Sequence, residues 1–271
     1  MQHTFETPTP TSVFVELGSG RVDVTATTTD QTTVTVDGKY AEDTLVEQRG
    51  DQIVVLAPRR TGFFGSSELL VGITLPEGSA IATKLGSADF VANGRLGGVR
   101  LKSGSGDVSL DSLDGESLIE TGSGDLSVHT VRGDLHGRTG SGDIMLQRVE
   151  APVRVSTGSG DVQATTVAAD LEVKSGSGDL LVRDAADDVA LTTASGDLEV
   201  TRMVRGQLHA KNVSGDIRVG IPAGIPVWTD VAAVTGRVSS SLQGAGQPAE
   251  GQDYVEVRAK TVSGDIHLEQ L

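Results

Sequence analysis

The chain of 271 residues contains no cysteine, five histidines and only 3% aromatic residues. Without cysteine it can form neither disulfide bonds nor thiolate metal sites, and it lacks a cysteine nucleophile. It has no apolar stretch of about 18 residues that could span a membrane as a helix. Its first residues also lack the basic region and apolar run of a secretory signal. These absences predict a cytoplasmic protein with no membrane partner.

Positive charge is scarce as well. The 22 lysines and arginines stand against 37 aspartates and glutamates, and the formal net charge is −15. Such a charge favours solubility and argues against nucleic acid as a partner. The histidines form no His-x-x-x-His or His/Glu cluster, so neither a transition-metal site nor a Ser-His-Asp triad is expected. They are His3, His129, His136, His209 and His267.

What the chain has in abundance is a Gly-Ser-Gly-Asp corner, in places slightly varied. Its aspartate recurs every 18 residues, then after a step of 19, and returns once near the end. These residues are Asp89, Asp107, Asp125, Asp143, Asp161, Asp179, Asp197, Asp216 and Asp265. A fixed period of this length predicts a stacked repeat protein.

Apolar residues occupy fixed positions relative to each aspartate. Those one and three places after it, such as Val108 and Leu110, alternate with polar residues as in a short strand. Those eight and six places before it, such as Val153 and Val155, predict a second inward-facing strand. The pattern recurs at nine residues, which argues against the left-handed hexapeptide β-helix, whose apolar positions recur every six.

Strands of successive coils would stack in parallel about 4.8 Å apart. The sequence therefore predicts an all-β fold, a single-stranded parallel β-helix (solenoid) with about 18 residues per coil. Right-handed crossovers dominate among parallel connections, so we expect a right-handed helix. We predict one domain over 1–271, with N-terminal coils at 1–88 that include excursions at 37–50 and 58–68, regular coils at 89–216, and C-terminal coils at 217–271 with a loop at 243–252.

The corner has a structural explanation and a competing chemical one. Glycine supplies a positive φ, and an aspartate carboxylate can accept backbone N–H groups. A column of hydroxyl residues four places before the aspartate, such as Thr121 and Thr139, could bond its own members or the corner backbone. The competing interpretation is calcium binding between turns, with further oxygen ligands from Glu116, Asp134, Asp170 and Asp188. Because the second corner lacks the glycine motif, we favour the structural role.

Stacked aspartates would also approach the separation of about 5 Å that retaining glycosidases use. An active site needs one pair that differs from the rest, and no coil stands out. A polysaccharide-acting enzyme is therefore only the third alternative, and we assign no catalytic, cofactor-binding or metal-binding residue.

One face of this acidic chain is predicted to be basic. The outward positions of the second strand carry ten basic residues, opposed there by Glu120 and Glu172. Such a face could attract an anionic polymer or an acidic partner, or could simply be solvated. The aromatic residues that would stack bases are missing from it. The ten are Arg100, Lys102, His136, Arg138, Arg154, Lys174, His209, Lys211, Arg258 and Lys260.

The chain resembles a bacterial β-strand-repeat family known as putative adhesins. The resemblance covers nearly the whole sequence and is carried by short motifs in a fixed order. These include Phe5-Glu6-Thr7-Pro8, Leu75-Pro76-Glu77-Gly78, the Ser-Gly-Asp coils, Thr235-Gly236-Arg237-Val238 and Gly264-Asp265-Ile266. The resemblance implies a β-helix and no established activity.

We therefore expect a non-enzymatic, adhesin-like scaffold with an unknown protein partner or with self-association. A β-helix ends in open strands that can template another copy, and Phe63-Phe64 is a candidate apolar contact near the N-terminal end. Binding of Ca²⁺ or of an anionic polymer is the alternative. Function is expected where the repeat breaks, at the end loops, on the basic face, or at Arg21 and Arg237, which occupy the aspartate position.

Overall fold

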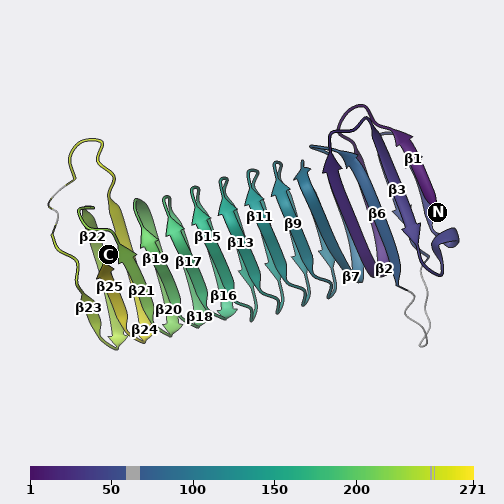
Figure 1. Cartoon of the computed structure of the whole chain (residues 1–271). Helices are drawn as coiled ribbons and strands as arrows, with labels where there is room; N and C mark the ends of the chain where they lie inside the picture. Colours follow the sequence, from purple (N-terminus) through teal and green to yellow (C-terminus); the bar gives the residue numbers. More distant parts are fainter. Residues whose placement is uncertain (59–67, 245, 247) are drawn as a thin grey trace. The chain divides into compact units, whose positions relative to one another are not determined.

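The computed structural model describes residues 1–58, 68–244, 246 and 248–271. The chain divides into two compact units, Met1–Thr139 and Gly140–Leu271, which we describe separately. Within the described residues every regular element is a β-strand, apart from one 3₁₀ turn, η1, at Ala41–Asp43 (Figure 1). The predicted all-β class is confirmed, whereas the single domain stays a prediction.

Each unit contains two ladders of parallel strands. We call them ladder A, with the strands before each aspartate corner, and ladder B, with the strands after it. In the first unit ladder A contains β8 (Val99–Ser103), β10 (Ser117–Thr121) and β12 (Leu135–Thr139), and ladder B contains β9 (Val108–Leu113) and β11 (Leu126–Val131). Paired residues such as Ser117 and Leu135 are 18 apart, which confirms the predicted period.

Side chains alternate along these strands between the core and solvent. Val108 and Leu110 are buried, as predicted, and Ser109 between them is exposed. Two long strands, β2 (Ser12–Thr27) and β7 (Ala80–Leu96), run through both ladders and pair with each other in parallel. The buried sides of the two ladders together form the core of the unit.

The N-terminal end of the first unit is closed by strands that run antiparallel to a neighbour. On ladder A, β4 (Leu45–Arg49) pairs with β5 (Gln52–Leu56), which lies parallel to β2. On ladder B, β1 (Gln2–Glu6) pairs with β3 (Gln31–Asp37), and β3 pairs with β6 (Leu69–Pro76). Antiparallel neighbours need only a tight turn, such as the one at Gly50 between β4 and β5.

These end strands correct part of the sequence-based expectation. The excursion predicted at 37–50 contains η1 and β4, and β4 extends a ladder instead of leaving it. The excursion predicted at 58–68, with its Phe63-Phe64 contact, falls almost entirely outside the described residues.

The second unit has the same two ladders. In spatial order ladder A contains β14 (Val153–Thr157), β16 (Leu171–Ser177), β18 (Val189–Ser195), β20 (Gly206–Ser214), β24 (Val255–Ser263) and β22 (Val227–Thr235). Ladder B contains β13 (Ile144–Val149), β15 (Val162–Val167), β17 (Leu180–Ala185), β19 (Leu198–Met203), β21 (Ile217–Ile221), β25 (Ile266–Gln270) and β23 (Val238–Ser240).

The last two coils of this unit are out of sequence order. Strand β24 lies between β20 and β22, and β25 lies between β21 and β23. Val257 of the inserted coil is fully buried, whereas the position paired with it in β22 is the exposed Thr229. The sequence predicted coils at 217–271 but not this exchange of layers.

Candidate functional site

The repeat aspartates form a hydrogen-bonded column within each unit. The Oδ1 atom of one carboxylate accepts the backbone N–H of the aspartate in the next coil, at 3.1 Å between Asp89 and Asp107 and 2.8 Å between Asp161 and Asp179. The predicted structural role is confirmed, but the partner differs, because the carboxylate satisfies the neighbouring coil and not its own corner.

The other corner residues are explained by how closely the coils approach. A Cβ atom on Gly106 would lie 1.9 Å from the carbonyl oxygen of Ala88, so only glycine fits there. The predicted positive φ applies elsewhere, as at Gly196 with a φ of 140°. In the hydroxyl column, Thr121 donates to the Gly124 carbonyl at 2.8 Å and lies 3.0 Å from the Thr139 hydroxyl, as the sequence predicted.

The two breaks in the aspartate column also have structural reasons. Arg237 lies in the coil of β22 and β23, where its N–H donates to Asp265 at 2.8 Å and no further coil follows among the described residues. Arg21 lies where β2 pairs directly with β7, and its side chain binds the neighbouring Asp23 at 2.8 Å. Neither position therefore requires a carboxylate.

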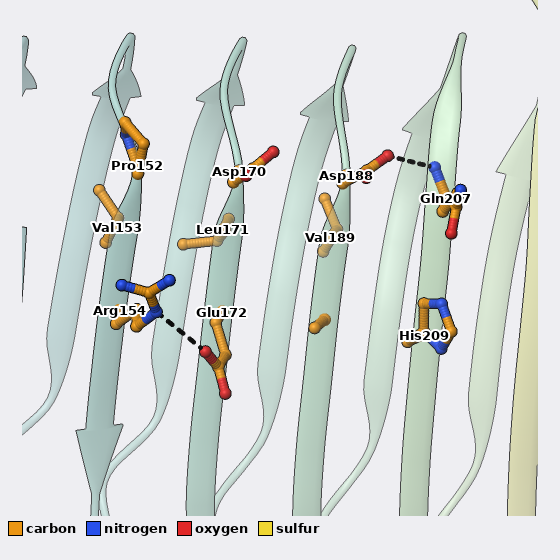
Figure 2. Close-up of a pocket in the computed structure, with 11 residues that line it drawn as sticks. Pro152, Val153, Arg154, Asp170, Leu171, Glu172, Asp188, Val189, Gln207 and His209 are labelled. Atoms are coloured by element: carbon orange, nitrogen blue, oxygen red, sulfur yellow. Dashed lines mark hydrogen bonds and ion pairs between the residues drawn. The ribbon is translucent and has the colours of Figure 1, made fainter. Parts of the chain in front are cut away.

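A hollow lined by charged, polar and apolar side chains lies on the outer face of ladder A in the second unit. It holds about 260 Å³ and extends across β14, β16, β18 and β20. Along these strands Arg154, Glu172, Ala190 and His209 are direct neighbours in register. The small Ala190 side chain leaves the space, and Figure 2 shows Glu172 and His209 on either side of it.

Three acidic residues line this hollow, and two of them, Glu172 and Asp188, already have partners within the chain. Asp188 accepts the backbone N–H of Gln207 at 2.8 Å, and Glu172 pairs with Arg154 at 3.3 Å (Figure 2). A hydrogen bond from Lys174 lowers the pKa of the Glu172 carboxyl, although partial burial opposes this shift. Glu172 is therefore a carboxylate at neutral pH and holds no proton for general acid catalysis.

The predicted basic face exists on the outer side of ladder A, and five of its ten basic residues form ion pairs with acids. In the first unit Lys102 pairs with Glu120 at 2.8 Å, and this contact lowers the pKa of the Glu120 carboxyl. In the second unit Lys174 pairs with Glu172 at 2.6 Å and Lys260 with Asp230 at 3.4 Å, while Arg258 contacts Glu256. The last two acids lie on neighbouring outward positions that the sequence pattern did not reveal.

Among the described residues, acids and histidines do not gather into a site for calcium or zinc. Within the part of the chain that the structure describes, no group of three or more histidines and acids is placed to hold a metal ion. The four acids of the second corner, Glu116, Asp134, Asp170 and Asp188, stay spread over separate coils. No helix among the described residues is long and apolar enough to cross a membrane.

Comparison with known proteins gives a family and several distant structural matches. The family model described as Toastrack DUF4097 matches residues 11–269. No match was found among curated proteins.

Several solved bacterial structures resemble this chain. A putative adhesin from Parabacteroides distasonis is 12% identical, with 99% of this chain and 96% of that chain covered and a TM-score of 0.46. A putative adhesin from Bacteroides fragilis is 10% identical, with 100% and 96% covered and a TM-score of 0.37. A putative lipid binding protein from Parabacteroides distasonis is 13% identical, with the same coverage and a TM-score of 0.35.

Proposed function

This chain belongs to the Toastrack DUF4097 family. We propose that it is a non-enzymatic scaffold that joins a second copy of itself through its outermost coil, which is formed by β22 and β23. We further propose that its ladders form a right-handed, single-stranded β-helix, in keeping with the parallel pairing of residues 18 apart. The coil of β22 and β23 carries the proposal, because its inward-facing residues remain partly exposed.

A scaffold role is supported by how the conspicuous acidic groups are used. The aspartate column repeats one backbone contact from coil to coil, whereas catalysis needs a group made different by its surroundings. In the outer hollow, Glu172 is held in its charged form by Lys174 and Arg154. Both observations favour a structural use of these side chains.

The coil of β22 and β23 differs from the coil beneath it. Val257 and Ala259 in β24 are fully buried, whereas their partners Thr229 and Val231 in β22 are exposed or half-buried. In β23, Val238 is 43% exposed, although its partner in β25 is fully buried. Apolar groups that would be core in any earlier coil thus remain accessible here.

The edge of this coil lacks the usual protection against strand pairing. Natural edge strands carry lysines, prolines or inward-pointing charges that prevent association. Within 227–240 the charged residues are Asp230 and Arg237, and Asp230 is already paired with Lys260 at 3.4 Å. Trp228 and Val234 are 52% and 75% exposed. No other strand pairs with the outer edge of β22 among the described residues.

A second copy fits this edge better than a chain of copies does. Two β22 strands related by a two-fold axis would pair antiparallel, each covering the half-buried residues of the other. A head-to-tail filament would need an N-terminal edge that matches β22. There the outermost strand, β1, runs antiparallel to β3 and places the half-buried His3 and Phe5 on its inward side, so the two edges differ in direction and in side chains. The expected product is a closed dimer.

Light scattering after size-exclusion chromatography tests this proposal. We expect a concentration-dependent rise toward twice the chain mass of 28.0 kDa. Val231→Lys places a charge at the edge and should keep the protein monomeric. Met145→Lys is the matched control, because it adds the same charge on an exposed position of β13. A strictly monomeric native protein, or a dimer that persists in Val231→Lys, would overturn the proposal.

The alternative proposal, an anionic polymer along ladder A, has weaker support. It needs cations free to bind, and four of the basic residues in the second unit already pair with acids on the same face. Calcium binding at the corners competes with the backbone N–H groups that occupy one oxygen of each bonded aspartate. A thermal unfolding experiment with and without millimolar calcium separates the structural role from the metal-binding one.

A further inference from the structure

A second hollow lies on the outer face of ladder A in the first unit, where β2, β7, β8 and β10 are neighbours. It holds about 170 Å³, and nearly all of its lining is apolar. In register across the strands, Phe14 pairs with Ala82, Ala82 with Arg100, and Arg100 with Leu118. The small Ala82 side chain leaves the space between the larger residues on either side.

Two large apolar side chains at this hollow face solvent and do not contribute to the core. Leu118 is 41% exposed and Phe14 is half-buried, although both lie on the outward side of their strands. A hollow of this volume accepts about six water-sized groups. That is enough for a short acyl segment or one small ring, and too little for a folded partner.

Three cations border this apolar hollow: Lys84 of β7, and Arg100 and Lys102 of β8. Lys84 and Lys102 are direct cross-strand neighbours, and in the same row Glu16 lies beside Lys84 and Glu120 beside Lys102. Lys102 pairs with Glu120 at 2.8 Å, and the Lys84 ammonium lies 5.9 Å from the centre of the Phe14 ring. For Arg100 no ion pair is found among the described residues. The three cations line the hollow and the two glutamates do not, so an anion in the hollow would be attracted to its border.

We propose that this hollow binds a free anionic amphiphile, such as a medium-chain carboxylate. The acyl segment lies against Phe14, Ala82 and Leu118, and the carboxylate accepts hydrogen bonds from Arg100 and Lys84, while Lys102 stays paired with Glu120. The combination of an apolar floor and a cationic rim selects for both parts of such a molecule. A simple anion would lack the apolar contact, and a neutral alcohol would lack the charge.

The hollow of Figure 2, in the second unit, differs from this one in the residues that line it. It also forms beside an outward alanine, Ala190, but its neighbours are Glu172 and His209 in place of Phe14 and Arg100. Asp170, Glu172 and Asp188 line it and would repel an anionic head group, whereas no carboxylate lines the first hollow. The two hollows therefore provide a test site and a matched control within one chain.

Titration calorimetry and ligand-observed NMR with octanoate, 1-octanol and acetate test the proposal on the full chain. We expect octanoate to bind more tightly than octanol, and acetate not to bind. Ala82→Leu fills the hollow and should weaken octanoate binding by about tenfold or more, from the lost apolar burial. Lys84→Gln should weaken it by about two- to fivefold. Ala190→Leu, the control, should leave it unchanged.

Three outcomes would overturn the proposal. The first is equal binding by native protein and Ala82→Leu, both shown to be folded by circular dichroism. The second is equal affinity for octanoate and octanol, which would remove the role of the cations. The third is association with anionic vesicles in the absence of any octanoate binding, which would point to a membrane surface instead of a free ligand.

Discussion

The two ends of this chain finish the solenoid differently. In the first unit, the end strand β1 runs antiparallel to β3, and its half-buried His3 and Phe5 lie outside the fully buried Val34. In the second unit, β22 and β23 keep the parallel order of the ladders, and their inward residues remain exposed or half-buried. Each end therefore leaves an edge strand partly exposed, but only the end of the second unit continues the parallel repeat to that edge.

A charge placed beneath one end strand and a charge placed in the other should give the largest difference in stability. Val34→Asp, beneath β1, puts an unpaired carboxylate among fully buried residues, and we expect a loss of about 3–5 kcal/mol in unfolding free energy. Val231→Asp, in the end strand β22, should cost less than about 1 kcal/mol because solvent reaches it. Urea unfolding of both variants, at concentrations where the protein is monomeric, measures the difference. Equal losses would show that solvent reaches both positions equally.

The aspartate column offers a second test within the second unit. Asp179→Ala removes the acceptor that lies 2.8 Å from the backbone N of Asp197, and because this contact is exposed the loss should be about 0.5–1 kcal/mol. Asp265→Ala affects only the N–H of Arg237 in the last coil, so its effect should be smaller. Amide hydrogen exchange at Asp197 and Arg237 reports each contact directly. Faster exchange at Arg237 in the native protein would agree with an open end.

The smallest expected effect concerns charge on the regular coils. The hydrogen bond from Lys174 and the attraction of Lys174 and Arg154 hold the pKa of Glu172 below its ordinary value of 4.5. This contribution to stability is complete above that ordinary value and is lost as the pH falls through the lower folded-state value. Because the side chain is 36% exposed, we expect a few tenths of a kcal/mol.

Comparison of the native protein with Glu172→Gln checks this prediction. The acid limb of the stability curve should be slightly flatter in the variant, and the two curves should run parallel at neutral pH. A loss of several kcal/mol, or a loss confined to alkaline pH, would contradict the assigned sign.

Much of the fold was accessible from the sequence because side chains in strands alternate strictly. The spacing of Val153 and Val155 relative to Asp161 was enough to place a strand, its buried side and its partner 18 residues away. The layer exchange was not accessible, since β22 and β24 carry the same alternation. The polar Thr229 at an inward position was the available signal that β22 ends the stack.

The hollows were equally hidden until the register was known. Their walls come from residues one coil apart, such as Phe14 and Ala82, whose spacing in the irregular N-terminal region does not follow the period of 18. The sequence does contain one sign of each hollow. Ala82 and Ala190 occupy an outward position that most other coils fill with a larger side chain. Ion pairs on the basic face depend on how far each side chain extends and in which direction. The order of residue types in the sequence does not give this information.

The exchanged layer sets an order of events during synthesis. Residues 227–240 leave the ribosome before residues 255–270, yet they have no neighbour to pair with until β24 and β25 arrive between them and the coil of β20 and β21. We therefore expect the earlier segment to wait unpaired, tethered by the loop, while the later one completes the ladders. The inner coil of β24 and β25 must therefore form before β22 and β23 can pair, although it is synthesised after them.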